Sequence, residues 1–127
     1  MKYASEIKLS LESAIRNLQA AEESLQKAEF DIAASRAAES VFHTASVLLL
    51  DEEIQPGQHG DVIGLIHRIF VNGRRLTKEQ GEHLSWLFEL RSMEGQAMPR
   101  PVSSEEARRA VEFARSFFAA AKVILEA

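Results

Sequence analysis

The sequence contains no cysteine among its 127 residues. This absence excludes disulfide bonds, thiol nucleophiles and cysteine-ligated zinc sites. Long apolar stretches are also missing, and none approaches the roughly 20 consecutive apolar residues that a membrane-spanning helix needs. Charged residues occur throughout positions 1–27, so the sequence predicts neither a secretory signal peptide nor a membrane span. We therefore expect a cytoplasmic protein that does not associate with a membrane.

Strong positive charge is lacking as well. The formal net charge is −4, which argues against broad nonspecific binding to nucleic acid. The sequence has no glycine-rich phosphate loop and no recognisable nucleophile motif. Its histidines, His43, His59, His67 and His83, are not spaced from one another or from carboxylates as metal ligands usually are. We therefore expect neither a bound metal nor a cofactor.

Hydrophobic residues make up 46% of the chain and charged residues 27%, which is typical of a globular domain. Apolar residues recur at three- and four-residue spacing, so the sequence predicts helices and no sheet. The predicted helices cover residues 4–27, 31–50, 61–71, 77–95 and 103–124. Their predicted N-caps include Asp31, Asp61, Thr77 and Ser103, the last two in capping boxes with Gln80 and Glu106. Asn72-Gly73 is expected to end the third helix with a left-handed residue or a tight turn.

These segments predict one all-α domain over residues 1–127, folded as a five-helix antiparallel bundle of the up-down type. The length suits a single domain. Small residues at positions 33–38 should let a neighbouring helix approach the second helix closely, and its apolar far end indicates burial on more than one side.

Two sets of polar residues are candidates for a binding site. Arg36, Ser40 and His43 lie at positions i, i+4 and i+7 of the second predicted helix, so they share one face. An arginine and a histidine on a mostly apolar helix need partners, which can be a bound anion or polar groups of the protein itself. Arg91, near the end of the fourth predicted helix, is either a ligand-binding residue or a cation stabilised by the helix dipole.

Several segments resemble, in order, those of a known family. Residues 34–50 (ASRAAESVFHTASVLLL) resemble one helix of that family. Residues 58–60 (QHG), 70–73 (FVNG) and 87–91 (LFELR) resemble its loop, its turn and the segment that leads into its arginine motif. By these segments the chain is similar to HEPN domains, specifically the UPF0332 branch, over about residues 10–125.

The resemblance implies a helical bundle that forms homodimers. Many HEPN members are metal-independent RNases, often toxins encoded beside a nucleotidyltransferase antitoxin. Their catalytic motif is an arginine followed after four to six residues by a histidine, with a tyrosine at that place in the UPF0332 branch. This sequence keeps the arginine as Arg91 but has Gln96 at the histidine position, and no histidine follows His83. A glutamine cannot act as a general base near neutral pH.

Three hypotheses follow from the sequence. The first is a non-catalytic or weakly active dimeric module that binds a nucleotide or RNA phosphate through Arg36 and Arg91, or binds a nucleotidyltransferase-like partner. The second is a metal-independent endoribonuclease that uses Arg91 and Arg36 with His43 or His59 as the base. The third is a purely structural subunit of a helical assembly.

Overall fold

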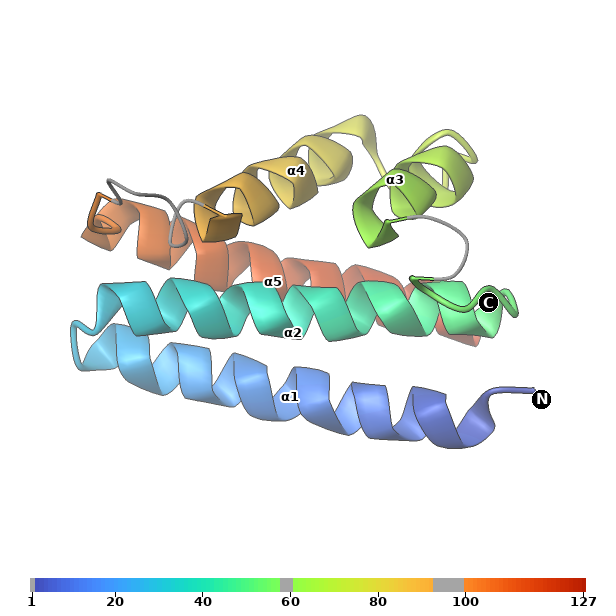
Figure 1. Cartoon of the computed structure of the whole chain (residues 1–127), viewed down its shortest axis with the longest axis horizontal. Helices are drawn as coiled ribbons and strands as arrows, with labels where there is room; N and C mark the ends of the chain where they lie inside the picture. The colour runs from blue at the N-terminus through green and yellow to red at the C-terminus, as the bar shows by residue number, and fades with distance from the viewer. Residues whose placement is uncertain (1, 58–60, 93–99) are drawn as a thin grey trace.

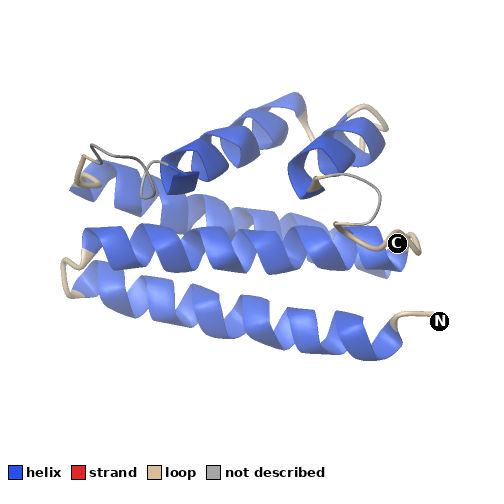
Figure 2. Cartoon of the chain, viewed as in Figure 1, coloured by secondary structure: helices blue, strands red, loops and turns tan. Residues whose placement is uncertain are grey.

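The computed structural model describes residues 2–57, 61–92 and 100–127. Every regular element within these ranges is a helix (Figure 2), which confirms the predicted all-α fold class. In chain order the elements are α1 (Ala4–Gln26), α2 (Phe30–Asp51), α3 (Val62–Ile66), the π-helix η1 (His67–Val71), α4 (Lys78–Ser92) and α5 (Ser104–Glu126). Because η1 continues α3 without a break, the described residues form the five helical segments that the sequence predicts.

The successive long helices alternate in direction, as the predicted up-down bundle requires (Figure 1). The helix α2 is central and contacts α1, α3, α4 and α5. Its second half explains this position, because residues 44–50, nearly two full turns, are all buried. The fold therefore places the buried polar residues of α2, Ser40, Thr44 and Ser46, at junctions between helices.

The contact between α1 and α2 is formed by small side chains. Ala14 and Ala21 of α1 are fully buried, and so are Ala33 and Ala37 of α2. The larger apolar residues of α1 flank this contact, and Ile15 is 42% exposed. The predicted close approach of a helix to α2 is therefore present, although small residues bring the helices together more than the leucine and isoleucine stripe of α1 does.

The predicted capping boxes are both present. Thr77 and Gln80 exchange hydrogen bonds between side chain and backbone at the start of α4, and Ser103 and Glu106 do so at the start of α5. The prediction for Asp31 is wrong, because Glu29 occupies the N-cap position of α2. The Asp31 carboxylate instead accepts a 2.8 Å hydrogen bond from the Val102 backbone, so it ties the segment before α5 to the start of α2.

The turn after η1 also differs in detail from the expectation. The left-handed residue is Arg74, with φ of 62°, and neither Asn72 nor Gly73 has a positive φ. Gly73 is needed for a different reason, since a Cβ at this position would lie 2.3 Å from the Ile69 carbonyl oxygen. The Asn72 amide donates to the His67 carbonyl at 2.9 Å, an i to i+5 bond that defines the π-helical turn.

Candidate functional site

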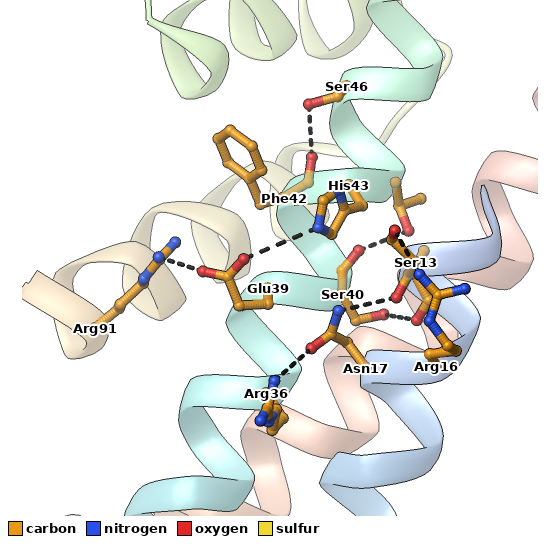
Figure 3. A network of polar contacts seen from close by, with 12 residues as sticks. Ser13, Arg16, Asn17, Arg36, Glu39, Ser40, Phe42, His43, Ser46 and Arg91 are labelled. Carbon is orange, nitrogen blue, oxygen red and sulfur yellow. Dashed lines mark hydrogen bonds and ion pairs between the residues drawn. The ribbon is translucent and has the colours of Figure 1, made fainter. Parts of the chain in front are cut away.

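The site begins with the packing of α4 against the core. Leu84 and Leu87 are fully buried and Leu90 is 5% exposed, so the apolar face of α4 is fixed against the bundle. Arg91 lies one turn after Leu87 and is therefore directed along the same side of α4. Its side chain crosses to α2 and forms an ion pair with Glu39 (Figure 3). A helix fixed by its buried face thus holds Arg91, whose side chain is 39% exposed.

Glu39 joins Arg91 to one of the predicted site histidines. Its other carboxylate oxygen lies 3.9 Å from His43 Nε2, one turn further along α2. The side chains of Glu39 and His43 are 31% and 29% exposed, so both remain accessible at the surface. The structure therefore brings Arg91 and His43 to a common carboxylate (Figure 3).

The other members of the predicted polar face, Ser40 and Arg36, contact α1. Ser40 is fully buried, and its hydroxyl donates a 2.8 Å hydrogen bond to the Ala14 carbonyl of α1. Arg36 Nη1 lies 3.4 Å from the Asn17 side-chain oxygen, also on α1. Figure 3 shows Arg36 one turn below Glu39 and turned toward Asn17, whereas Arg91 approaches Glu39 from α4. The contacts of Arg36 are thus made with α1, away from those of Arg91.

Two candidate residues cannot be placed. His59 and Gln96 lie outside the described residues. Among the residues that are described, no group of three or more histidines and carboxylates is arranged to hold a metal ion. Within the same ranges, no helix has the length and apolarity needed to cross a bilayer.

Aromatic side chains border the charged site. The Phe42 ring makes an edge contact with His43, at 5.9 Å between ring centroids. It also lies 6.4 Å from the ring of Phe88 on α4. Both phenylalanines are half-buried and line a groove of about 360 Å³, together with residues that include Ile63 and Asp61 near the start of α3. A charged cluster and an apolar groove therefore lie next to each other on this part of the molecule.

Comparison with known proteins assigns the fold to a family. A family model described as HEPN domain matches residues 7–124, which is nearly the whole chain. The chain belongs to the HEPN domain family. Two proteins of Methanocaldococcus jannaschii are similar to this HEPN chain. "Putative toxin MJ0142" is 27% identical over 107 residues, which cover 84% of this chain and 73% of that protein. "Putative toxin MJ0605" is 29% identical over 100 residues, which cover 79% and 75%.

Sequence reasoning missed one residue at the centre of this HEPN site. Glu39 was not among the candidates, although it lies four residues before His43, a spacing at which side chains on a helix meet. The four-residue spacing of Glu39 and His43 could therefore have identified this pair from the sequence. The contact with Arg91 had no such signal, because it depends on the packing of α4 against α2.

Proposed function

We propose that this HEPN chain is a toxin-type module that binds a phosphate group of a nucleotide or of RNA at Arg91. The observation that carries the proposal is the position of Arg91, fixed by the buried face of α4 but 39% exposed beside Glu39. A guanidinium is permanently charged, and its planar fork of donors matches a phosphate. The names of the two relatives support a setting of the toxin–antitoxin kind. Arg36 is left out because its contact is with Asn17.

The proposal extends to the oligomeric state and the partner of the chain. We propose a homodimer of the UPF0332 branch that acts in the cytoplasm and has a nucleotidyltransferase-like protein as its partner. The resemblance of residues 34–50 and 87–91 to that branch supports this assignment. Light scattering over micromolar concentrations should then give a mass near twice 14.2 kDa. A mass that stays at the monomer value throughout would contradict the dimer.

The proposed module has little or no catalytic activity of its own. General acid–base catalysis contributes roughly 10²–10⁴-fold when a suitably placed group is present. Gln96 has no titratable proton near neutral pH, so that contribution should be missing from the usual motif. Replacement of Gln96 by histidine is expected to restore some cleavage if the remaining groups suffice.

The endoribonuclease remains the second candidate, and one observation favours it. His43 and Arg91 contact the same Glu39 carboxylate, so an acid–base group lies close to the phosphate-binding arginine without any contribution from position 96. Metal-independent cleavage that is abolished in His43→Ala would establish this candidate. The same cleavage lost only in His59→Ala would assign the base to His59.

The test of the main proposal is RNA binding with a matched arginine control. Anisotropy of a labelled single-stranded RNA, measured with EDTA at two salt concentrations, should show weak binding that weakens further with salt. Arg91→Ala should remove most of it. Arg115→Ala should leave it unchanged, since Arg115 is also exposed and also pairs with a glutamate, Glu22, but lies on α5.

Two outcomes would contradict the phosphate-binding proposal. Equal losses in Arg91→Ala and Arg115→Ala would show that only overall charge matters. No binding at all, by a chain that still assembles into oligomers, would instead favour the purely structural subunit. Co-purification from the native host, with protein and nucleic acid both identified, tests the proposed partner.

A further inference from the structure

The groove next to the charged site has the features of a base-binding pocket. Two half-buried aromatic rings, Phe42 of α2 and Phe88 of α4, face it with their centroids 6.4 Å apart. Its volume of about 360 Å³ lies within the roughly 300–1,000 Å³ of small-ligand pockets. Proteins that recognise single-stranded RNA stack its unpaired bases on such rings and form hydrogen bonds with the base edges.

The helical register connects the groove to the proposed phosphate site. Phe88 precedes Arg91 by three residues on α4, and Phe42 follows Glu39 by three residues on α2. Residues three apart on a helix are neighbours on its surface. Figure 3 shows the Phe42 ring projecting from α2 on the side from which Arg91 approaches Glu39. A phosphate on Arg91 would therefore carry its nucleoside directly to the groove.

A single carboxylate gives the groove a chemical preference. Asp61 lies at its edge and caps α3, with Oδ1 accepting a 2.7 Å hydrogen bond from the Gly64 amide. A carboxylate can accept about four hydrogen bonds, so Asp61 can cap α3 and still accept a hydrogen bond from a ligand. The amino group of cytosine is such a donor, whereas uracil has a carbonyl oxygen at the same place. The rings give binding without sequence preference, and Asp61 adds a preference for an amino-bearing base.

We propose that the groove lined by Phe42 and Phe88 is a nucleobase subsite that prefers cytosine to uracil, adjoining the phosphate site at Arg91. This inference rests on the proposed phosphate binding, which fixes one end of the ligand. Phe42 contacts His43, and Phe88 lies three residues before Arg91, so the groove borders the charged cluster; this favours a base over another occupant, such as an apolar side chain of a second copy.

The experiment compares three RNA hexamers that carry the same phosphates: oligocytidine, oligouridine and an abasic ribose-phosphate chain. Oligocytidine is expected to bind at least about fivefold more tightly than the abasic chain, the lower end of what base–aromatic stacking contributes. It should also bind about fivefold more tightly than oligouridine, as a hydrogen bond to a charged acceptor allows.

Three variants assign these differences to the groove. Phe88→Leu keeps an apolar side chain but removes the ring, so it should bring oligocytidine close to the abasic chain. Phe118→Leu is the matched control, because Phe118 is also half-buried but lies on α5 outside the groove. Asp61→Asn still caps α3 but should abolish the preference for cytosine. Melting curves verify that each variant is folded.

The outcomes separate this inference from the function on which it rests. If none of the hexamers binds, the phosphate proposal fails. If all three bind equally and Arg91→Ala weakens all three, the phosphate proposal stands and the base subsite is refuted. A Phe88→Leu variant that halves the solution mass without changing base preference would also refute the subsite, because the groove would then be covered by a second copy.

Discussion

Replacement of Glu39 by glutamine should strengthen phosphate binding. In the protein without ligand, Glu39 forms an ion pair with Arg91, so its carboxylate competes with any phosphate for the same donors. An exposed pair of this kind contributes about 0.2–1 kcal/mol. A phosphate on the far side of the guanidinium, roughly 7 Å from the carboxylate, would also be repelled by about 0.6–2.4 kcal/mol for an effective dielectric constant between 80 and 20.

Removing the Glu39 charge should therefore make the binding free energy more favourable. Part of this gain is offset in the variant, because Arg91 loses the partner that orders its side chain. A net gain of about 1 kcal/mol remains, which corresponds to about fivefold tighter binding. The assay is RNA anisotropy for wild type, Glu39→Gln and Glu22→Gln. The last variant is the control, since Glu22 also pairs with an exposed arginine, 3.5 Å away, and its replacement changes the net charge equally.

Two results would refute the reasoning. Weaker binding by Glu39→Gln would show that Glu39 mainly positions Arg91 and does not compete with the ligand. An equal gain in Glu22→Gln would show that binding responds only to the overall charge of the protein.

Further predictions concern stability. Hydrogen bonding by Arg100 and the Ser103 backbone lowers the pKa of Glu106 from 4.5 to about 2, so the ionised form stabilises the fold above about pH 4.5 and this contribution is lost toward pH 2. Glu106→Gln keeps the capping box but lacks the charge. Its urea midpoint should therefore fall below that of wild type at pH 6 and match it near pH 2. A difference in midpoint that does not depend on pH would contradict this. Gly73→Ala should cost about 1–3 kcal/mol in the free energy of unfolding, because its Cβ would lie 2.3 Å from the Ile69 carbonyl oxygen; an unchanged melting temperature would show that the turn can relax. Ser40→Ala should cost about 0.5–1.5 kcal/mol by urea unfolding, since a buried 2.8 Å hydrogen bond to the Ala14 carbonyl is lost; no loss would mean that this bond does not stabilise the contact between α1 and α2.

The helices could be predicted from the sequence because their signals are local. Thr77 with Gln80 and Ser103 with Glu106 are spaced so that side chain and backbone can satisfy each other within one turn. The role of Asp31 could not be predicted in this way. Its partner, the Val102 amide, lies 71 residues further along the chain, so the contact exists only after α5 has packed beside α2.

The shared face of Arg36, Ser40 and His43 could be predicted from the sequence, but the helices that its two edges meet could not. Successive residues of an α-helix are about 100° apart, so Arg36 and His43 point within about 20° of each other. Ser40 lies about 40° to one side of Arg36 and Glu39 about 60° to the other. The Ser40 side meets α1, whereas the Glu39 side meets α4. A face defined from one helix alone could not reveal which neighbour each of its edges would meet.

Binding and cleavage make different demands on this site. Binding needs a fixed cation, and Arg91 provides one on a helix whose apolar face is buried. Cleavage of an RNA phosphodiester also needs proton transfer at both the attacking and the leaving oxygen, which lie roughly in line on opposite sides of the phosphorus. Arg91 and His43 reach the same Glu39 carboxylate, so a single protomer places one acid–base histidine on one side of a bound phosphate. We propose that a second copy supplies the matching group on the other side, so activity should depend on dimerisation more strongly than phosphate binding does. Cleavage by a monomeric variant that is lost in His59→Ala would instead assign the matching group to the same protomer.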